Sequence, residues 1–323
     1  MLKKIIILFI TGIIILPIFG SVHATLEEPT QPEQPISGPG SSDYSHSLVI
    51  KTRYKRGEQL YWIFEPLMPK PESAPLIVFN HGWSAMHPII YRAWINHIVK
   101  KGNIVVYPRY QKGLVRGFEN FTSNAINAVK DAIETLSKGW HVRPELDKFA
   151  ILGHSLGGGI TANMAALAEE KGLPIPKAIM PVQPYVNSFD TADFSKISNN
   201  TIMLVIVGED DQIAGNHSAR IIFENTTQIP LSRKDFVIQV TDDYGTPDIV
   251  ADHHAPISFL RNWFNSVNAM DYYSTWKLFD ALTDYAFYGK NLEYCLGNTP
   301  EQRFMGLWSD GTPVNELIIT DNP

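Results

Sequence analysis

Residues 148–159 read Lys-Phe-Ala-Ile-Leu-Gly-His-Ser-Leu-Gly-Gly-Gly, and this stretch decides the fold. Its first half, Phe149 to Leu152, is a short apolar run that is typical of a buried strand. The run ends at Gly-His-Ser-Leu-Gly, and residues 160–171 continue with a strong helical pattern. A strand, a Gly-x-Ser-x-Gly turn and a helix in direct succession predict a serine held on a sharp turn between strand and helix.

Ser155 stands at the centre of this turn. A residue there takes a strained backbone conformation with positive φ, and neighbouring chain segments pass close to it. Gly153 and Gly157 leave the necessary space because they have no side chain. The turn lifts the hydroxyl above the carboxyl edge of the sheet, near the positive end of the following helix. The sequence therefore predicts Ser155 as a nucleophile, and a glycine-rich turn with a bystander serine is the alternative interpretation.

The composition suits one large globular domain. The chain has 323 residues, of which 44% are hydrophobic and 19% are charged, so a sizeable core can form. Its net charge of -6 gives no indication of a nucleic-acid partner or of electrostatic membrane binding. Because there is one cysteine, Cys295, no intrachain disulfide can form and the core must hold the fold.

The N-terminus resembles a targeting segment. Residues 1–24 contain two early lysines, an apolar stretch and small residues before a cleavage position after Ala24, which predicts a signal peptide. A retained membrane anchor is the alternative; after cleavage we expect no stable membrane insertion. Residues 25–43 are rich in Pro, Glu, Gln, Gly and Ser and predict a disordered linker. The remainder, 44–323, is interpreted as a single domain of a secreted or periplasmic protein.

Short apolar runs alternate with helical patterns along this domain. Strands are predicted at 48–54, 59–65, 76–79, 104–107, 149–152, 178–182, 201–207 and 236–240, and helices at 88–101, 121–138, 160–171, 257–269 and 272–288. The first two strands read as an antiparallel pair. The alternation predicts a mostly parallel sheet with helices on both faces, and the last helix is a C-terminal extension. Active sites in such sheets lie at the carboxyl ends of the strands.

Three motifs carry a resemblance to a known superfamily. They are His-Gly-Trp at 81–83, Gly-His-Ser-Leu-Gly-Gly-Gly at 153–159 and Asp-His-His-Ala-Pro at 252–256. From about residue 48 to residue 267 the chain resembles an α/β-hydrolase. Within that superfamily it is similar to dienelactone-hydrolase-like, chlorophyllase-like and cutinase-type polyester hydrolases. It departs from true dienelactone hydrolases in having a serine in place of the nucleophilic cysteine.

The resemblance implies that an acid and then a histidine follow the serine along the chain. In the family the acid stands in a Gly-x-x-Asp-x-Ile/Val loop, and residues 208–213 read Gly-Glu-Asp-Asp-Gln-Ile. This pattern selects Asp211, whose carboxylate would orient the base and stabilise the imidazolium formed during attack. Asp210 and Glu209 remain alternatives.

The base is expected after the last predicted strand. Matching the family's Asp-His-x-Ala-Pro pattern to residues 252–256 makes His253 the base and puts His254 in the variable place. The opposite assignment, with His254 as the base, remains open. Two adjacent histidines in a loop cannot point the same way, so the second one is expected to line the substrate cleft.

An oxyanion hole needs two backbone N–H groups aimed at the tetrahedral oxygen. The resemblance assigns one to Leu156, directly after the nucleophile, and the other to Trp83 of the His-Gly-x loop. His81 and His154 stand close to these positions in the sequence, but both are expected to be buried structural residues without a role in proton transfer.

These features predict an esterase that needs no cofactor. Tyr185 and Phe189 follow a strand at the active-site edge and are candidates for the substrate pocket, and the short 183–200 segment predicts a short cap over an open cleft. The other histidines are scattered without ligand spacing, so no catalytic metal is expected. The expected reaction is cleavage of a small or polymeric carboxylic ester through a Ser-His-Asp triad and an acyl-enzyme. A non-catalytic binding protein and a hydrolase of amides or thioesters are the alternatives.

Overall fold

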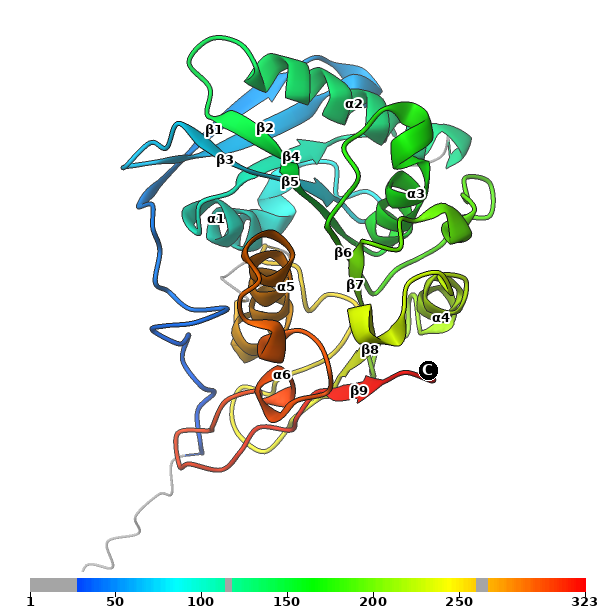
Figure 1. Cartoon of the computed structure of the whole chain (residues 1–323). Coiled ribbons are helices and arrows are strands. Elements are labelled where there is room, and N and C mark those ends of the chain that lie inside the picture. The colour runs from blue at the N-terminus through cyan, green and yellow to red at the C-terminus, as the bar shows by residue number, and fades with distance from the viewer. Residues whose placement is uncertain (1–27, 114–117, 260–266) are drawn as a thin grey trace, which may run out of the picture.

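The computed structural model describes residues 28–113, 118–259 and 267–323, and its centre is one sheet (Figure 1). Nine strands of the described residues join in the order β1-β2-β4-β3-β5-β6-β7-β8-β9. Their bounds are β1 Leu48–Tyr54, β2 Tyr61–Leu67, β3 Ser73–Asn80, β4 Ile104–Pro108, β5 Arg143–His154, β6 Ala178–Val182, β7 Ile202–Gly208, β8 Lys234–Gln239 and β9 Ile318–Thr320. The non-sequential order β4-β3-β5 places β5, which leads to Ser155, in the middle of the sheet.

The sheet is mostly parallel, as the sequence predicts. The pairs from β4 through β3, β5, β6 and β7 to β8 are parallel, whereas β1–β2, β2–β4 and β8–β9 are antiparallel. A central parallel strand is covered on both faces, so its residues are apolar without alternation. The buried run Ile202–Gly208 follows this rule along its whole length. This is the architecture of an α/β-hydrolase fold.

Helices cover both faces of the sheet (Figure 1). The sheet therefore separates two layers of core side chains. On one face lie α1 (Arg92–Lys100) and α5 (Trp276–Tyr288); on the other lie α2 (Phe121–Leu136), α3 (Leu156–Lys171) and α4 (His217–Glu224). Successive side chains of a strand point to opposite faces of the sheet. Ile77 packs in the core layer of α1 and α5, and Val78 packs in the layer of α2 and α3. The smaller elements are Gly57–Gln59, Pro88–Tyr91, Phe118–Asn120, Phe194–Lys196, Leu231–Arg233, Leu292–Tyr294, the π-helical Asp271–Thr275 and α6, Pro300–Arg303.

The segment before β1 corrects one expectation. Residues 28–43 do not form a disordered linker; they run along the molecule and lie beside the C-terminal segment (Figure 1). Backbone hydrogen bonds join Pro29 to Thr246 and Thr30 to Ser309, and Ser41 is fully buried. The polar, proline-rich composition hid this packing because the segment is held by backbone hydrogen bonds and not by an apolar stripe. Residues 25–27 and the predicted signal peptide, 1–24, lie outside the described residues.

The sheet extends one strand further than the sequence predicts. The strand β8 is not the last, because β9 pairs antiparallel with it, with Phe236 opposite Thr320. With three residues, β9 is too short to give a periodic pattern. The predicted helix at 257–269 falls mainly on residues 260–266, outside the described part of the chain.

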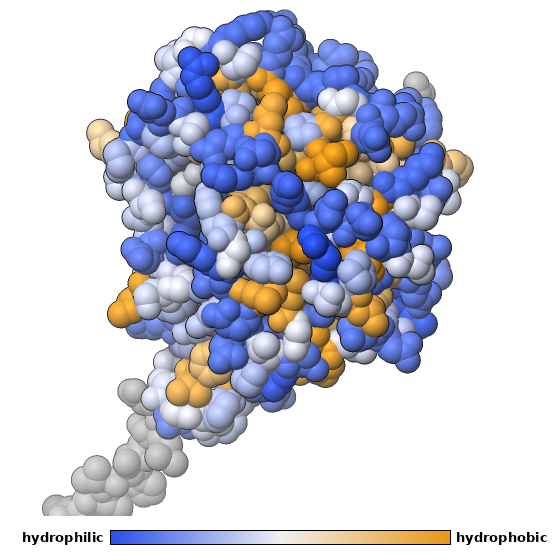
Figure 2. All heavy atoms as spheres, viewed as in Figure 1, coloured by the Kyte–Doolittle hydropathy of each residue, from blue (hydrophilic) through white to orange (hydrophobic). Residues whose placement is uncertain are grey.

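The segment between β6 and β7 forms the short cap that the sequence predicts. Over residues 183–201 its helical structure is the single turn Phe194–Lys196. The face in Figure 2 is mainly hydrophilic, with apolar residues in separate small patches. None of the helices in the described part of the chain combines the length and the apolarity that crossing a membrane requires.

Candidate active site

Ser155 occupies the strained turn that the sequence predicts. Its backbone has φ 56 and ψ -125, and it lies between the end of β5 and the start of α3. A Cβ on Gly153 would lie 2.3 Å from the carbonyl oxygen of Gly157, and one on Gly157 would lie 2.3 Å from that of Asn80. Both glycines are therefore required by close backbone contacts, and the turn holds the Ser155 side chain in a fixed direction.

Three side chains form a continuous hydrogen-bonded chain, here called the Ser155 chain. The His253 Nδ1–H donates to Asp211 Oδ2 at 2.8 Å, which leaves His253 Nε2 free to accept the Ser155 hydroxyl at 2.9 Å. The Asp211 side chain is fully buried and 8% of the His253 side chain is exposed. The residues follow β5, β7 and β8, so the parallel sheet gathers them at its carboxyl edge.

Local backbone groups fix the Asp211 carboxylate. Its Oδ1 accepts the N–H groups of Ile213 at 2.9 Å and Ala214 at 2.8 Å. Burial by itself would raise the pKa of Asp211, but the hydrogen bonds from His253 and from these backbone groups outweigh burial and lower that pKa below its ordinary value. The carboxylate is thus charged at neutral pH and keeps the proton of His253 on Nδ1.

The alternative acids lie elsewhere. The Asp210 carboxylate accepts the Thr241 hydroxyl, and the Glu209 carboxylate accepts the Thr241 backbone N–H. Both are therefore engaged on the loop after β8 and do not orient His253. The structure brings Asp211, and neither competitor, together with His253 and Ser155.

The two adjacent histidines point in different directions. Their rings are nearly perpendicular, at 86°, with centroids 5.9 Å apart. His253 is turned to Ser155, whereas His254 is exposed and its backbone N–H donates to the Asp252 side chain. The geometry of a base is therefore found at His253.

The two backbone N–H groups predicted for an oxyanion hole belong to residues that lie near Ser155 in the chain or in space. Leu156 begins α3, and Trp83 follows Gly82, whose ideal Cβ would lie 3.3 Å from the Cβ of Ser155. Within the described residues neither the Leu156 nor the Trp83 N–H has a hydrogen-bond partner. The start of α3 adds the partial positive charge of a helix N-terminus. The assignment of the Trp83 and Leu156 N–H groups to an oxyanion hole stays a prediction.

His81 and His154 are buried, as expected for structural residues. The His81 ring is stacked on Tyr110 with centroids 4.0 Å apart, and burial lowers the pKa of His81 to about 4. Burial and the neighbouring His253 lower the pKa of His154 to about 3. Both imidazoles are therefore neutral at ordinary pH.

Two candidate pocket residues, Tyr185 and Phe189, lie on the surface in the loop that follows β6. The Tyr185 N–H donates to the Ser155 carbonyl at 2.9 Å, and 52% of Tyr185 is exposed. Phe189 lies four residues further along the loop and is 77% exposed. The assignment of Tyr185, Phe189 and His254 to a substrate pocket stays a prediction.

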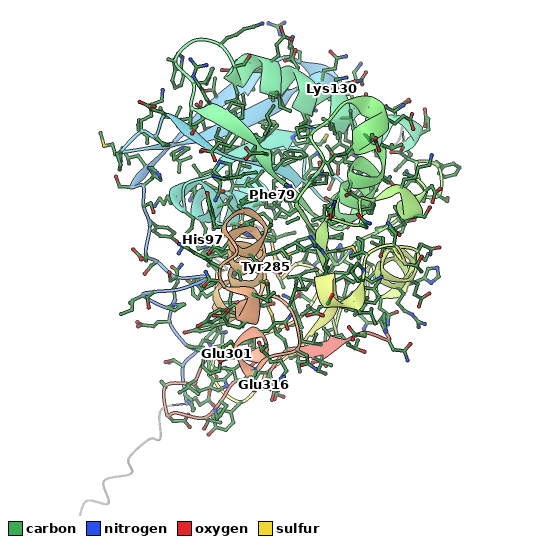
Figure 3. The ribbon with its side chains drawn as sticks, in the orientation of Figure 1. Phe79, His97, Lys130, Tyr285, Glu301 and Glu316 are labelled. Atoms are coloured by element: carbon green, nitrogen blue, oxygen red, sulfur yellow. The ribbon has the colours of Figure 1, made fainter. Side chains whose placement is uncertain are left out.

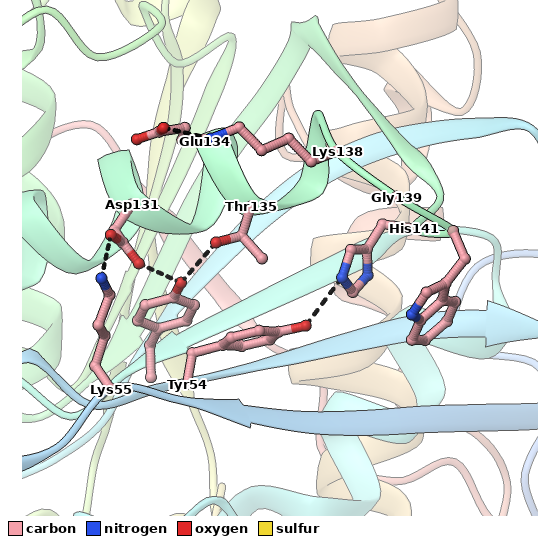
Figure 4. Close-up of a pocket in the computed structure, with 10 residues that line it drawn as sticks. Tyr54, Lys55, Asp131, Glu134, Thr135, Lys138, Gly139 and His141 are labelled. Atoms are coloured by element: carbon pink, nitrogen blue, oxygen red, sulfur yellow. Dashed lines mark hydrogen bonds and ion pairs between the residues drawn. The ribbon is translucent and has the colours of Figure 1, made fainter.

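A pocket of about 590 Å³ lies elsewhere, between α2, the loop before β5 and the outer strands (Figure 4). Its polar groups are paired with one another: Asp131 binds Lys55 and Tyr61, and the Tyr54 hydroxyl pairs with His141. This pocket therefore offers no unpaired reactive group. In the part of the chain that the structure describes, no three His, Cys, Asp or Glu side chains are grouped so that they could hold a metal ion.

Sequence reasoning missed two buried partners of His154. Tyr91 Oη lies 2.8 Å from His154 Nδ1, and Gln183 Oε1 lies 3.1 Å from His154 Nε2. Gln183 directly follows β6 at the active-site edge, which is the one sequence signal it carries. Tyr91 ends a 3₁₀ turn before α1 and has no such signal, because the contact depends on tertiary folding.

Comparison with known proteins agrees with the fold. Residues 61–189 match the family model described as chlorophyllase. The match begins in β2 and ends after β6, so it includes the Trp83 loop and the Ser155 turn but neither Asp211 nor His253. No curated protein matches the chain. The chain thus has an α/β-hydrolase fold that is chlorophyllase-like over this region, which suggests an ester hydrolase of the α/β-hydrolase type.

Proposed function

We propose that this protein is a secreted serine hydrolase that cleaves carboxylic esters through an acyl-enzyme intermediate. One observation carries the proposal: the unbroken hydrogen-bonded chain from Asp211 through His253 to Ser155. A serine hydroxyl is a weak nucleophile at neutral pH, and an adjacent imidazole held in the correct tautomer activates it. The similarity to chlorophyllases over residues 61–189 favours ester hydrolysis among the reactions that such a triad serves.

The first half-reaction forms the acyl-enzyme. Ser155 Oγ attacks the ester carbonyl carbon while its proton moves to His253 Nε2. The carbonyl oxygen becomes an oxyanion and is bound by the N–H groups of Trp83 and Leu156. The tetrahedral intermediate then collapses: the bond to the leaving alcohol breaks, and the imidazolium gives the alcohol its proton. Asp211 stabilises the imidazolium but keeps its own charge.

The second half-reaction uses water in place of the serine. His253 Nε2 takes a proton from a water molecule as the water attacks the acyl carbonyl, and the same two N–H groups bind the second oxyanion. Collapse returns the proton to Ser155 Oγ and releases the carboxylic acid. The enzyme needs no cofactor for this cycle.

The surroundings of Ser155 favour medium-sized or bulky esters. Trp83 and Tyr185 are each 52% exposed beside the turn, and the cap between β6 and β7 contains one three-residue helical turn. Apolar rings at an open rim suit an acyl or alcohol group too large for a closed pocket. The basic and apolar residues before Ala24, outside the described part of the chain, support export.

The proposal is tested with a fluorophosphonate probe and a series of p-nitrophenyl esters of rising chain length. We expect covalent labelling of the wild-type protein and turnover of the esters, both abolished in Ser155→Ala. The matched control is Ser123→Ala, which removes an exposed hydroxyl on α2 and should keep full labelling. Labelling that survives in Ser155→Ala would contradict the proposal.

The same assay separates the alternatives. A binding protein with a hydrolase fold would show neither labelling nor turnover. An amidase or thioesterase would be labelled at Ser155 and would cleave the matching unactivated alkyl amide or thioester. We expect the alkyl oxygen ester to be cleaved, the matching amide to stay intact and the thioester to have a lower kcat/KM than the oxygen ester.

A further inference from the structure

A buried hydrogen-bonded network passes beneath Ser155. The Gly82 N–H bonds to Tyr91 Oη at 3.0 Å, and Tyr91 Oη lies 2.8 Å from His154 Nδ1. On the other side, His154 Nε2 lies 3.1 Å from Gln183 Oε1, and Gln183 Nε2 lies 2.7 Å from the carbonyl oxygen of Asp252. Tyr91 and Gln183 are fully buried and His154 is 2% exposed.

The direction of every hydrogen bond in this network is determined. The Asp252 carbonyl can only accept, so the amide NH₂ of Gln183 donates to it and the amide oxygen faces His154. That oxygen also only accepts, so His154 carries its proton on Nε2 and Nδ1 is an acceptor. Tyr91 must then donate its hydroxyl proton to Nδ1, and its oxygen accepts the Gly82 N–H. The pKa of His154, lowered to about 3 by burial, keeps this tautomer neutral.

The network ends next to both groups that must be aligned with Ser155. Gly82 directly precedes Trp83, and Asp252 directly precedes His253. In between, the His154 ring packs against the His253 ring, with centroids 4.7 Å apart. The backbone at Gly82 is packed so closely that an ideal Cβ there would lie 3.0 Å from Tyr91 Oη. The Trp83 loop and the His253 loop are thus joined by one chain of buried hydrogen bonds.

We propose that Tyr91, His154 and Gln183 are positioning residues that set the Trp83 N–H and the His253 imidazole jointly with respect to Ser155. The inference rests on the proposed ester hydrolysis. None of the three touches the reacting atoms in this role; they act through Gly82 and Asp252. Misplacing a catalytic group by about 1 Å can cost roughly 100-fold in rate, so a network that fixes both loops has a direct effect on turnover.

The test removes each end of the network without changing its volume greatly. Tyr91→Phe deletes one hydroxyl and leaves Gly82 N–H and His154 Nδ1 without a partner. Gln183→Met removes both amide contacts. We expect each variant to lower kcat on a p-nitrophenyl ester by about 10- to 100-fold with little change in KM, because the surface that meets the ester is untouched.

The double variant and a control distinguish positioning from a general loss of stability. If one network carries both effects, the double variant loses about as much kcat as the worse single variant, and the losses do not multiply. The matched control is Tyr61→Phe, which deletes another fully buried hydroxyl, bonded to Asp131 and Thr135 beside α2. It should lower the melting temperature and leave kcat unchanged.

The outcomes separate the inference from the function on which it rests. If the wild-type protein does not hydrolyse the ester, or if Ser155→Ala still does, both the proposed function and this inference are overturned. Turnover that depends on Ser155, with kcat of Tyr91→Phe and Gln183→Met at the wild-type value, overturns the inference alone; losses that multiply in the double variant do the same. If neither variant folds, nitrogen NMR of wild-type His154 decides: a proton on Nε2 supports the network, and one on Nδ1 overturns it.

Discussion

The Ser155 chain and a second chain, built from Glu65, His141 and Tyr54, have the same order of groups: carboxylate, imidazole, hydroxyl. In the second, here called the Tyr54 chain, Glu65 Oε2 accepts the His141 Nδ1–H at 2.7 Å and the Tyr54 hydroxyl pairs with His141 Nε2 at 2.9 Å. His141 precedes the start of β5 and Ser155 follows its end. One strand thus separates two chains of nearly equal geometry.

Burial does not distinguish the two chains. The exposed fractions are 7% for the His141 side chain and 1% for Glu65, against 8% and 0% for His253 and Asp211. Burial, and then the charge of Glu65, raise the pKa of Tyr54 above its ordinary value. The phenol of Tyr54 and the alcohol of Ser155 are both protonated at neutral pH, so the difference between the two chains lies in what surrounds the hydroxyl.

The surroundings of the hydroxyl complete the contrast. Tyr54 ends β1, and its ring is stacked on Tyr61 with centroids 5.3 Å apart. Ser155 stands on a strained turn at the N-terminus of α3, and among the described residues the N–H groups of Leu156 and Trp83 have no hydrogen-bond partner. A carboxylate–histidine pair becomes a catalytic base only where the neighbouring alcohol and the oxyanion donors are also in place; elsewhere it ties structural elements together.

A third hydrogen-bonded chain of carboxylate, imidazole and hydroxyl also ties structural elements together. His97 Nε2 pairs with Asp280 Oδ2 at 2.9 Å, and His97 Nδ1 lies 3.1 Å from the Tyr44 hydroxyl. Asp280 also accepts the Gly40 N–H. His97 lies on α1 (Figure 3) and Asp280 lies on α5, so this chain joins the segment before β1 to both helices.

The largest expected effect comes from removing the two histidines in turn. His253→Gln should lower kcat/KM for an ester by about 10⁴-fold or more, because Ser155 loses its base. His141→Gln should leave kcat/KM unchanged but lower the free energy of unfolding by about 2–4 kcal/mol, because the buried Glu65 loses the imidazole and keeps only the Val142 N–H as a partner. Steady-state kinetics and urea unfolding of both variants check the pair, and a His141→Gln enzyme as slow as His253→Gln would break the comparison.

The carboxylates give the next largest effect. Asp211→Asn should lower kcat by about 10³- to 10⁴-fold, because an amide at this position no longer holds the His253 proton on Nδ1. Glu65→Gln is the matched change in the Tyr54 chain and should leave kcat as in the wild type. If Asp211→Asn kept most of its activity, another group would have to orient His253.

Much of the site could be predicted because its residues belong to short local patterns. The Gly-His-Ser-Leu-Gly turn, the Asp211 loop and the 252–256 loop each follow a strand, and a parallel sheet brings strand ends together. The packed segment 28–43 and β9 could not be predicted, since neither has an apolar period. Their hydrogen bonds join residues far apart in the sequence, as do those of Tyr91 with His154.

Acid should destabilise the fold through the buried histidines of the active-site side. The unfolded chain binds a proton at His154 below its ordinary pKa of 6.5, but the folded chain does so only at a pKa of about 3. The neutral His154 therefore contributes its full share of the free energy of unfolding above pH 6.5. This share is lost as the pH falls toward 3, at up to about 1.4 kcal/mol per pH unit. Urea unfolding measured from pH 7 to pH 4 gives the dependence of the free energy of unfolding on pH. This dependence should be weaker in His154→Asn than in the wild type.

An exposed, uncharged residue of α2, Ser123, supplies the control for this titration. Ser123→Ala should keep the wild-type dependence of unfolding free energy on pH, because it removes no titrating group. An equal slope in wild type and His154→Asn would show that His154 takes up its proton in the folded protein as readily as in the unfolded chain.

The smallest expected effect is that of the hydroxyl in the Tyr54 chain. Tyr54→Phe should lower the free energy of unfolding by about 0.5–1.5 kcal/mol, the usual net contribution of one hydrogen bond, and should not change kcat. Thermal unfolding and ester kinetics of the same preparation check both statements. A marked loss of kcat would tie the Tyr54 chain to catalysis.

The position of the acyl group during turnover decides whether Ser155 is the nucleophile. The wild-type protein is mixed with a p-nitrophenyl ester, quenched in acid within the first turnovers, digested and examined by mass spectrometry. We expect one acylated residue, Ser155, and no acyl group on Tyr54. Turnover with the acyl group on another residue, or on none, would rule out an acyl-enzyme at Ser155.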